Sequence, residues 1–396
     1  MPVKTISRIV AIPFVIAVIA VSSFAQSEDE RMEELFETLP ETISEDALEE
    51  SEIITALDII EYYRQHPIVL METTSDVLAE LPLFDHVIAL KIIDLVQLTG
   101  MGDYDELADS LKLSENQSYI LQECSIMERT VEDAGDAENL AVRVRNKSIL
   151  EEMKGFREDK FEGTPLDLYQ RMTYNNGAFA AGLLTGKDAG EKSITDFYSG
   201  YLDINLKKSR LILGDYYPAV GTGNVLWRSF GFRKGIEVIS PAAQLGSGIK
   251  PYRSSIEANL FRGGALDHRF DLGSGSLKSS IWISKQKRSA NIDTSGKIAL
   301  SIDNTGFHRT ETEIDKKDRI SEDIYGGNLE YFSKAFAVGV TGFYMAYDKT
   351  VESSAKTAFY GKDGIIGSVY GSADLWGARF VGEISRDGNG YPGMRA

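Results

Sequence analysis

The feature that most constrains the fold is an alternation of apolar and polar side chains with a period of two, which runs through the last two thirds of the chain. In residues 197–206, for example, apolar side chains such as Leu202 and Ile204 alternate with polar ones such as Asp203. Successive side chains of a β-strand point to opposite faces of a sheet, so each run places its apolar set on one face. The sequence therefore predicts an antiparallel all-β domain over residues 131–396.

Two all-β architectures fit this pattern, a transmembrane barrel with a polar lumen and a soluble β-sandwich. Strand segments of about ten residues match a tilted transmembrane strand. Glycine and alanine are frequent within the strands, where a crowded lumen accommodates small residues. We therefore predict an incomplete transmembrane β-barrel and keep the sandwich as the alternative. The aromatic residues near strand ends, which would form the girdles at the membrane interfaces, are Tyr174, Tyr198, Tyr216, Trp227, Phe332, Tyr344, Tyr360 and Tyr370.

The N-terminus has the layout of a secretory signal peptide. Lys4 and Arg8 precede an apolar run over residues 9–21, and small residues follow, ending at Ala25. This run is too short to span a bilayer comfortably, so we predict a signal peptide over residues 1–25, with a membrane anchor as the alternative. The mature chain is thus expected to be exported.

A strongly acidic segment follows. Residues 26–125 contain 25 Asp and Glu against 4 Lys and Arg, a net charge of −21, whereas the remainder of the mature chain is close to neutral. Apolar residues such as Leu57 and Ile60 recur there at helical spacing. A shift in both charge and periodicity indicates a separate α-helical module, which we place at residues 26–130.

Within this module a short helix, a turn and a longer helix occur twice. Residues 78–80 lead through residues 82–85 into an apolar helix, and residues 107–109 lead through residues 111–114 into a second one. The pattern resembles tandem helix-hairpin-helix units, and residues 66–70 resemble the lead-in of that family. The resemblance implies a helix-hairpin-helix-like module.

Helix-hairpin-helix units usually bind DNA, because glycines in their hairpins let backbone N–H groups approach a phosphate. These hairpins contain no glycine, and the charge of the module repels DNA. We therefore expect a scaffold role or docking to a periplasmic protein partner, and not DNA binding. The alternative is a periplasmic DNA-binding protein of the competence or DNA-uptake type, in which the hairpin residues at the DNA would be Leu83, Phe84, Lys112 and Leu113.

Further motifs lie between residues 188 and 265, and they include Asp188-Ala189-Gly190-Glu191, Leu213-Gly214-Asp215-Tyr216, Gly221-Thr222-Gly223, Pro251-Tyr252-Arg253-Ser254-Ser255 and Phe261-Arg262-Gly263-Gly264-Ala265. In these motifs the chain as a whole resembles helix-hairpin-helix domain-containing envelope proteins of the Bacteroidetes type, which join such repeats to a predicted outer-membrane barrel. The resemblance covers most of residues 30–270 and implies an outer-membrane location, a periplasmic module and no defined activity. Barrels of that family are longer, and residues 391–396 lack a closing aromatic strand, so we expect a fragment.

No constellation of catalytic residues stands out at a spacing that supports a mechanism. Cys124 is the only cysteine and the four histidines are scattered, so the sequence predicts no metal site, no disulfide and no cofactor. We expect a non-enzymatic protein that contacts outer-membrane lipid, with a soluble exported hydrolase as the alternative. One charged set could bind a solute in the lumen or hold loops by ion pairs, and its members are Asp215, Arg253, Glu257 and Arg262.

Overall fold

The computed structural model describes residues 59–64, 66–71, 73, 75–84, 86–128, 139–148, 151–206, 208–226, 245–246, 248–254, 257, 260–273, 275–333, 336–352, 359–375 and 378–395. The predicted signal peptide, the helix predicted around Leu57 and the aromatic Trp227 lie outside these residues. Residues 59–64 are helical. The labelled helices are α4 (Ser75–Leu78), α5 (His86–Thr99), α6 (Tyr104–Leu111), α7 (Glu115–Cys124), α8 (Lys154–Arg157) and α9 (Glu311–Lys316).

The strands form a two-stranded sheet and one large sheet. The small sheet pairs β1 (Ile68–Val69) with β2 (Ser125–Ile126). The large sheet contains β3 (Asn139–Ser148), β4 (Leu166–Asn175), β5 (Phe179–Lys187), β6 (Phe197–Leu206), β7 (Ser209–Ala219), β8 (Gly248–Pro251), β9 (Phe261–Asp271), β10 (Gly275–Arg288), β11 (Ala290–Ile292), β12 (Ile298–Ile302), β13 (Ile320–Ser333), β14 (Phe336–Glu352), β15 (Tyr360–Leu375), β16 (Ala378–Asp387) and β17 (Pro392–Arg395).

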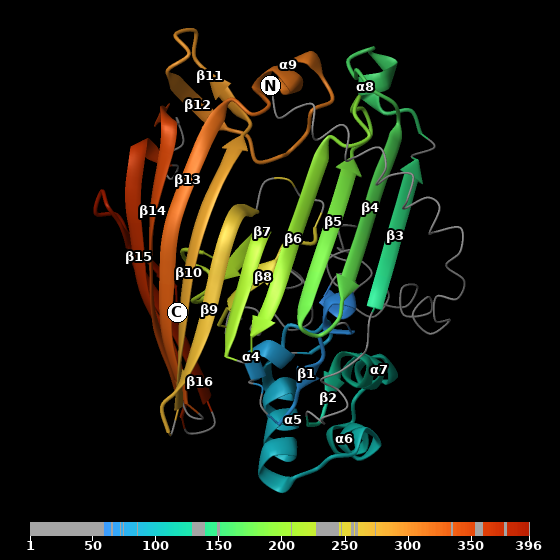
Figure 1. The fold of residues 1–396 in the computed structure, drawn as a ribbon, viewed down its shortest axis with the longest axis vertical. Coiled ribbons are helices and arrows are strands. Elements are labelled where there is room, and N and C mark those ends of the chain that lie inside the picture. The colour runs from blue at the N-terminus through green and yellow to red at the C-terminus, as the bar shows by residue number, and fades with distance from the viewer. Residues whose placement is uncertain are drawn as a thin grey trace.

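The large sheet is a curved wall in which neighbouring strands mostly follow one another in sequence (Figure 1). In the described part of the chain, 15 strands belong to it, with a main path from β3 to β17. Its pairs are antiparallel apart from β12 with β14, as expected where short connections join consecutive strands. The structure thus confirms the antiparallel β-architecture predicted from the period-two runs.

The two faces of this sheet have opposite chemistry. We call the face with buried side chains the inner face and the other the outer face. One row of cross-strand neighbours on the outer face is 47–64% exposed and consists of Leu329, Val340, Val369 and Ile384. The adjacent row on the inner face is 2–9% exposed and consists of Asn328, Thr341, Ser368 and Ser385. These rows, which cross β13 to β16, place apolar side chains outward and polar ones inward, which is the reverse of a soluble sheet that covers a core.

The predicted strand at residues 197–206 follows the same rule. Tyr198 and Leu206 are exposed on the outer face, whereas Ser199 and Asp203 are buried on the inner face. The assignment of this strand and of its two faces is confirmed.

Glycines within the strands make room for inward-pointing aromatic rings. A Cβ at Gly326 would lie 2.6 Å from the ring of Trp282, its cross-strand neighbour. Gly182 and Gly339 have the same relation to Tyr201 and Tyr370, with Cβ distances of 2.3 Å. Each ring thus lies flat over a backbone that carries no side chain, an arrangement known to stabilise strand pairing.

A turn after β7 crosses the inner face to reach β16. The backbone N–H groups of Thr222 and Asn224 donate to one carboxylate oxygen of Glu383, over 2.8 Å and 3.1 Å, and the Thr222 hydroxyl donates to it as well. Gly221 has a φ of 68°, a left-handed conformation that glycine adopts readily. The Gly221-Thr222-Gly223 motif is therefore a tight turn that holds an inner-face carboxylate.

The helices α4 to α7 lie at one end of the sheet (Figure 1). They share an apolar core with helical residues 59–64 and with β1. Helix α7 begins with a capping box, in which Ser114 and Gln117 bond each other's backbone N–H groups. No described helix is long and apolar enough to cross a membrane. The most deeply buried side chains of this core are Ile60, Leu70, Leu78, Ala89, Ile92, Val96, Leu107, Ile120, Leu121 and Cys124.

Two details of the sequence-based picture are corrected. Tyr216 and Tyr370 belong to the buried inner face, so they cannot contribute to an interfacial girdle. Their rings pack among inner-face neighbours, because register and not position near a strand end decides the side on which a side chain lies.

Candidate functional site

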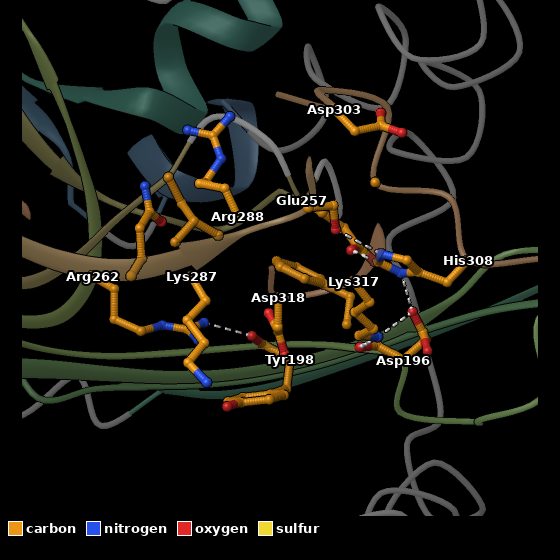
Figure 2. A pocket seen from close by; sticks show the side chains of 15 residues that line it. Asp196, Tyr198, Glu257, Arg262, Lys287, Arg288, Asp303, His308, Lys317 and Asp318 are labelled. Atoms are coloured by element: carbon orange, nitrogen blue, oxygen red, sulfur yellow. Dashed lines mark hydrogen bonds and ion pairs between the residues drawn. The ribbon is translucent and has the colours of Figure 1, made fainter. Parts of the chain in front are cut away.

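The four charged residues predicted as a lumen cluster do not form one cluster. Asp215 and Arg262 pair at 2.7 Å, and Arg262 stacks on the exposed ring of Tyr198, so this pair lies toward the outer face. Glu257 lines the same pocket as Arg262 (Figure 2). Arg253 lies apart from these residues, because its guanidinium contacts Glu61 of the helical module.

Arg253 belongs to a basic site that receives a carboxylate from the helical module. Arg143 on β3 and Arg171 on β4 are cross-strand neighbours. The carboxylate of Glu61, from helical residues 59–64, contacts Arg171 directly, lies 3.0 Å from Arg253 and 3.5 Å from Arg143. We call these three arginines the arginine site. Sequence reasoning identified Arg253 alone and missed its partners.

The arginine site determines the protonation of Glu61. The Glu61 carboxylate lies among three guanidinium groups, of which those of Arg171 and Arg253 are buried. Burial raises the pKa of Glu61, but the charges of Arg171, Arg253 and Arg143 outweigh burial and lower this pKa below its ordinary value. Glu61 is therefore ionised at neutral pH.

Two further contacts join the module to the inner face. Lys250 on β8 binds the carboxylate of Glu80 and donates to the hydroxyl of Tyr63 at 3.0 Å. Arg210 on β7 donates to the hydroxyl of Tyr62 at 2.8 Å while it forms an ion pair with the buried Asp203 on β6. The acidic module thus meets a basic inner wall, and this complementary charge accounts for part of its composition.

A second cluster joins three loops at the opposite end of the sheet. Glu191, Asp196, Glu257 and His308 offer potential metal-ligand atoms that all lie within 4.8 Å of one another. Asp196 lies 2.7 Å from both His308 Nδ1 and Lys317 Nζ (Figure 2). The positions are spread over more than a hundred residues, so spacing in the sequence carried no signal for them.

Hydrogen bonds of this cluster join the loops that carry it. Glu191 accepts the backbone N–H groups of Asp188 and His308 at 2.9 Å each. The other ring nitrogen of His308 lies 3.0 Å from the Ser289 hydroxyl. Glu257 approaches His308 only to 3.9 Å. We call Glu191, Asp196, Glu257 and His308 the loop clasp. Its contacts already occupy both histidine nitrogens, so they fit a structural role.

Burial sets the protonation of the loop clasp. Burial, followed by the charges of Asp196 and Glu191, raises the pKa of Glu257 to about 9. Burial, followed by the charge of Asp196, raises the pKa of Glu191 to about 7. Burial acts in the same direction on Asp196, but hydrogen bonds from His308 and Lys317 prevail and lower its pKa.

The loop clasp should weaken as pH rises. A carboxyl with a raised folded-state pKa binds its proton more tightly in the folded protein, so its contribution is complete below its ordinary pKa of 4.5 and is lost as pH approaches about 9. We expect the thermal stability of the wild type to fall between about pH 6 and about pH 9. Glu257→Gln, which resembles the protonated side chain, should remove most of this fall.

Thermal unfolding at both pH values, with Glu311→Gln as the control, measures the effect. Glu311 is an exposed acid on α9 and should leave the pH dependence unchanged. An undiminished fall in the Glu257→Gln protein would contradict the assignment.

The hairpin residues proposed for DNA contact occupy equivalent positions in the two repeats. Leu83 and Lys112 both have left-handed backbones, with φ of 70° and 55°. Phe84 is buried, and Leu113 packs against the core of the module. Gln117 links the hairpins by donating its side-chain N–H to the Leu83 carbonyl at 2.8 Å.

No family model matches the chain, and no curated protein matches it. Among the solved structures that match, a porin refined at 1.8 Å resolution is similar over 56% of this chain, with 13% sequence identity and a TM-score of 0.28. The matched region spans 56% of the porin, about half of its length. A likeness this weak supports no conclusion about function.

Proposed function

We propose that the chain is a non-enzymatic outer-membrane β-barrel protein whose inner face is occupied by an acidic, helix-hairpin-helix-like periplasmic module. The observation that carries this proposal is the inversion of the sheet, with apolar rows exposed and polar rows buried. The role that follows is passage or binding of a solute at the inner face, with the module as a docked plug.

Lipid is the partner that best suits the outer face. The exposed apolar side chains recur on β5, β6, β7, β9, β10, β13, β14, β15 and β16 and belong to one face by register. Removal of each such side chain from water contributes about 1.5–3 kcal/mol. Monomeric soluble proteins rarely expose an apolar surface this wide. A soluble sandwich would bury the apolar set and expose the polar set.

The module supports the proposal through its geometry. Left-handed backbones at Leu83 and Lys112, each followed by an apolar residue and the start of a longer helix, fit the hairpins of helix-hairpin-helix units. Its acidic side chains meet the basic inner wall through Glu61 and Glu80. A negative module docks poorly on phosphates, so we do not assign DNA as its partner.

Cysteine labelling tests the membrane assignment. Ile281 and Ser280 are neighbours on β10, one exposed on the outer face and the other buried on the inner face. Each is replaced by Cys in a Cys124→Ser background, which removes the one native thiol. In native outer membranes, the thiol at position 281 should react with a membrane-dissolved maleimide and resist a charged one. The thiol at position 280 should not react with the membrane-dissolved reagent.

Three results would overturn the proposal. Rapid reaction of position 281 with the charged maleimide would place the outer face in water. Inertness of position 281 to both reagents until denaturation would place it in a protein core. Recovery of the protein in the soluble periplasmic fraction would contradict its insertion in the outer membrane.

A further inference from the structure

Arg253 of the arginine site has donor groups that Glu61 does not satisfy. Arg143, Arg171 and Arg253 surround the carboxylate of Glu61. Arg253 is 6% exposed, yet its Nε and Nη1 groups have no hydrogen-bond partner, in the part of the chain that the structure describes. Only Nη2 of this guanidinium reaches Glu61. Buried polar groups are normally bonded, so two free N–H groups on a buried cation indicate a place for an acceptor.

The shape of the site favours an oxyanion. A guanidinium presents its N–H groups as a planar fork, which pairs with two oxygens of a carboxylate or phosphate. Arg253 also stacks on the ring of Tyr62, 5.5 Å from the ring centroid, which holds the fork in place. Tyr169 and Arg171 donate to the Arg253 carbonyl and so fix the backbone at the site.

We infer that the arginine site binds the oxyanion group of a small anionic solute, phosphate or carboxylate, and that Glu61 of the module competes with the solute for it. The inference rests on the proposed function and adds to it, because the Glu61 carboxylate of the docked module would occupy the site that the solute binds. Release of Glu61 without replacement would remove a carboxylate from two buried arginines, Arg171 and Arg253, which is costly. An incoming anion removes that cost, so arrival of the solute and departure of Glu61 are coupled.

Titration of the purified full chain in detergent with inorganic phosphate, and separately with succinate, tests the competition. If the docked carboxylate occupies the site most of the time, the apparent affinity falls in proportion to the fraction of open sites. Glu61→Gln keeps the shape of the side chain and removes its charge, and it should bind the preferred anion at least about tenfold tighter than the wild type. The anion whose affinity increases more in Glu61→Gln identifies the chemical class of the solute.

Substitutions of Arg253 provide the second arm. Arg253→Gln in the Glu61→Gln background should abolish the increase in anion affinity. Arg253→Lys in the same background keeps the charge but lacks the planar set of N–H donors, so it should retain part of the increase. Arg269→Gln is the control, because Arg269 is an exposed arginine on β9 that pairs with Asp271. It should bind as its parent does. Circular dichroism verifies that each variant retains its sheet.

Hydrogen exchange separates competition from binding elsewhere. Saturating phosphate or succinate should increase exchange in residues 59–64 of the wild type, because Glu61 leaves the site. Equal affinities in wild type and Glu61→Gln, loss of binding in Arg269→Gln, or binding without a change in exchange would each overturn the inference. The titration requires no bilayer, so it would stand even if the labelling test excluded a membrane.

Discussion

Trp282→Ala is expected to lower the free energy of unfolding by about 3–5 kcal/mol, in the range measured for buried large side chains. Trp282 points inward from the middle of β10 and is 2% exposed. It packs with Ile212, Tyr216 and Phe343 in the largest apolar cluster of the sheet. Its removal would leave a cavity that the rigid strands around it cannot fill.

Denaturant unfolding in detergent measures this loss, with Tyr391→Ala as the control for an exposed aromatic in a turn. Gly326→Val should destabilise for the opposite reason, because its side chain would meet the Trp282 ring. In the double variant Trp282→Ala with Gly326→Val, the loss in free energy of unfolding should be smaller than the sum of the losses in the two single variants. Additive losses would show that the ring and the glycine are not packed as one unit.

The sequence predicted the sheet well because alternation is a local property. Side chains two residues apart share a face whatever the rest of the chain does, so the faces of residues 197–206 could be assigned in advance. Turn chemistry was less decisive. Lys362-Asp363-Gly364 resembles a hairpin turn but lies within β15, where Asp363 and Gly364 pair with β14. Ladder hydrogen bonds to a neighbouring strand outweigh the local preference of these residues.

Loops and sites were predicted less well because they depend on distant contacts. The long polar stretch of residues 310–323 is typical of an exposed loop, yet it contains α9, which starts at a capping box between Thr310 and Glu313. Glu61 and Arg253 are 192 residues apart, and Glu191 and His308 are 117 apart. No spacing rule links such pairs, since only the register of the intervening strands brings them together.

Ile281→Arg is expected to have the other large effect, and it tests the environment of the outer face directly. Ile281 adjoins Trp282 but points to the opposite side, where it is exposed beside Leu266 of β9. In lipid, an arginine near the bilayer midplane costs about 2–4 kcal/mol and should impair insertion. In water, the same substitution at an exposed position should change stability by about 0.5 kcal/mol or less.

Assembly into outer membranes, followed by the protease resistance of the inserted sheet, gives the readout. Ile194→Arg is the matched control, because Ile194 is an exposed isoleucine in the loop between β5 and β6. We expect this control to insert normally and Ile281→Arg to accumulate uninserted. Because the two variants add the same charge at similarly exposed isoleucines, a difference between them reports what surrounds the strand. Equal insertion of both would mean that the apolar rows of the sheet do not face lipid.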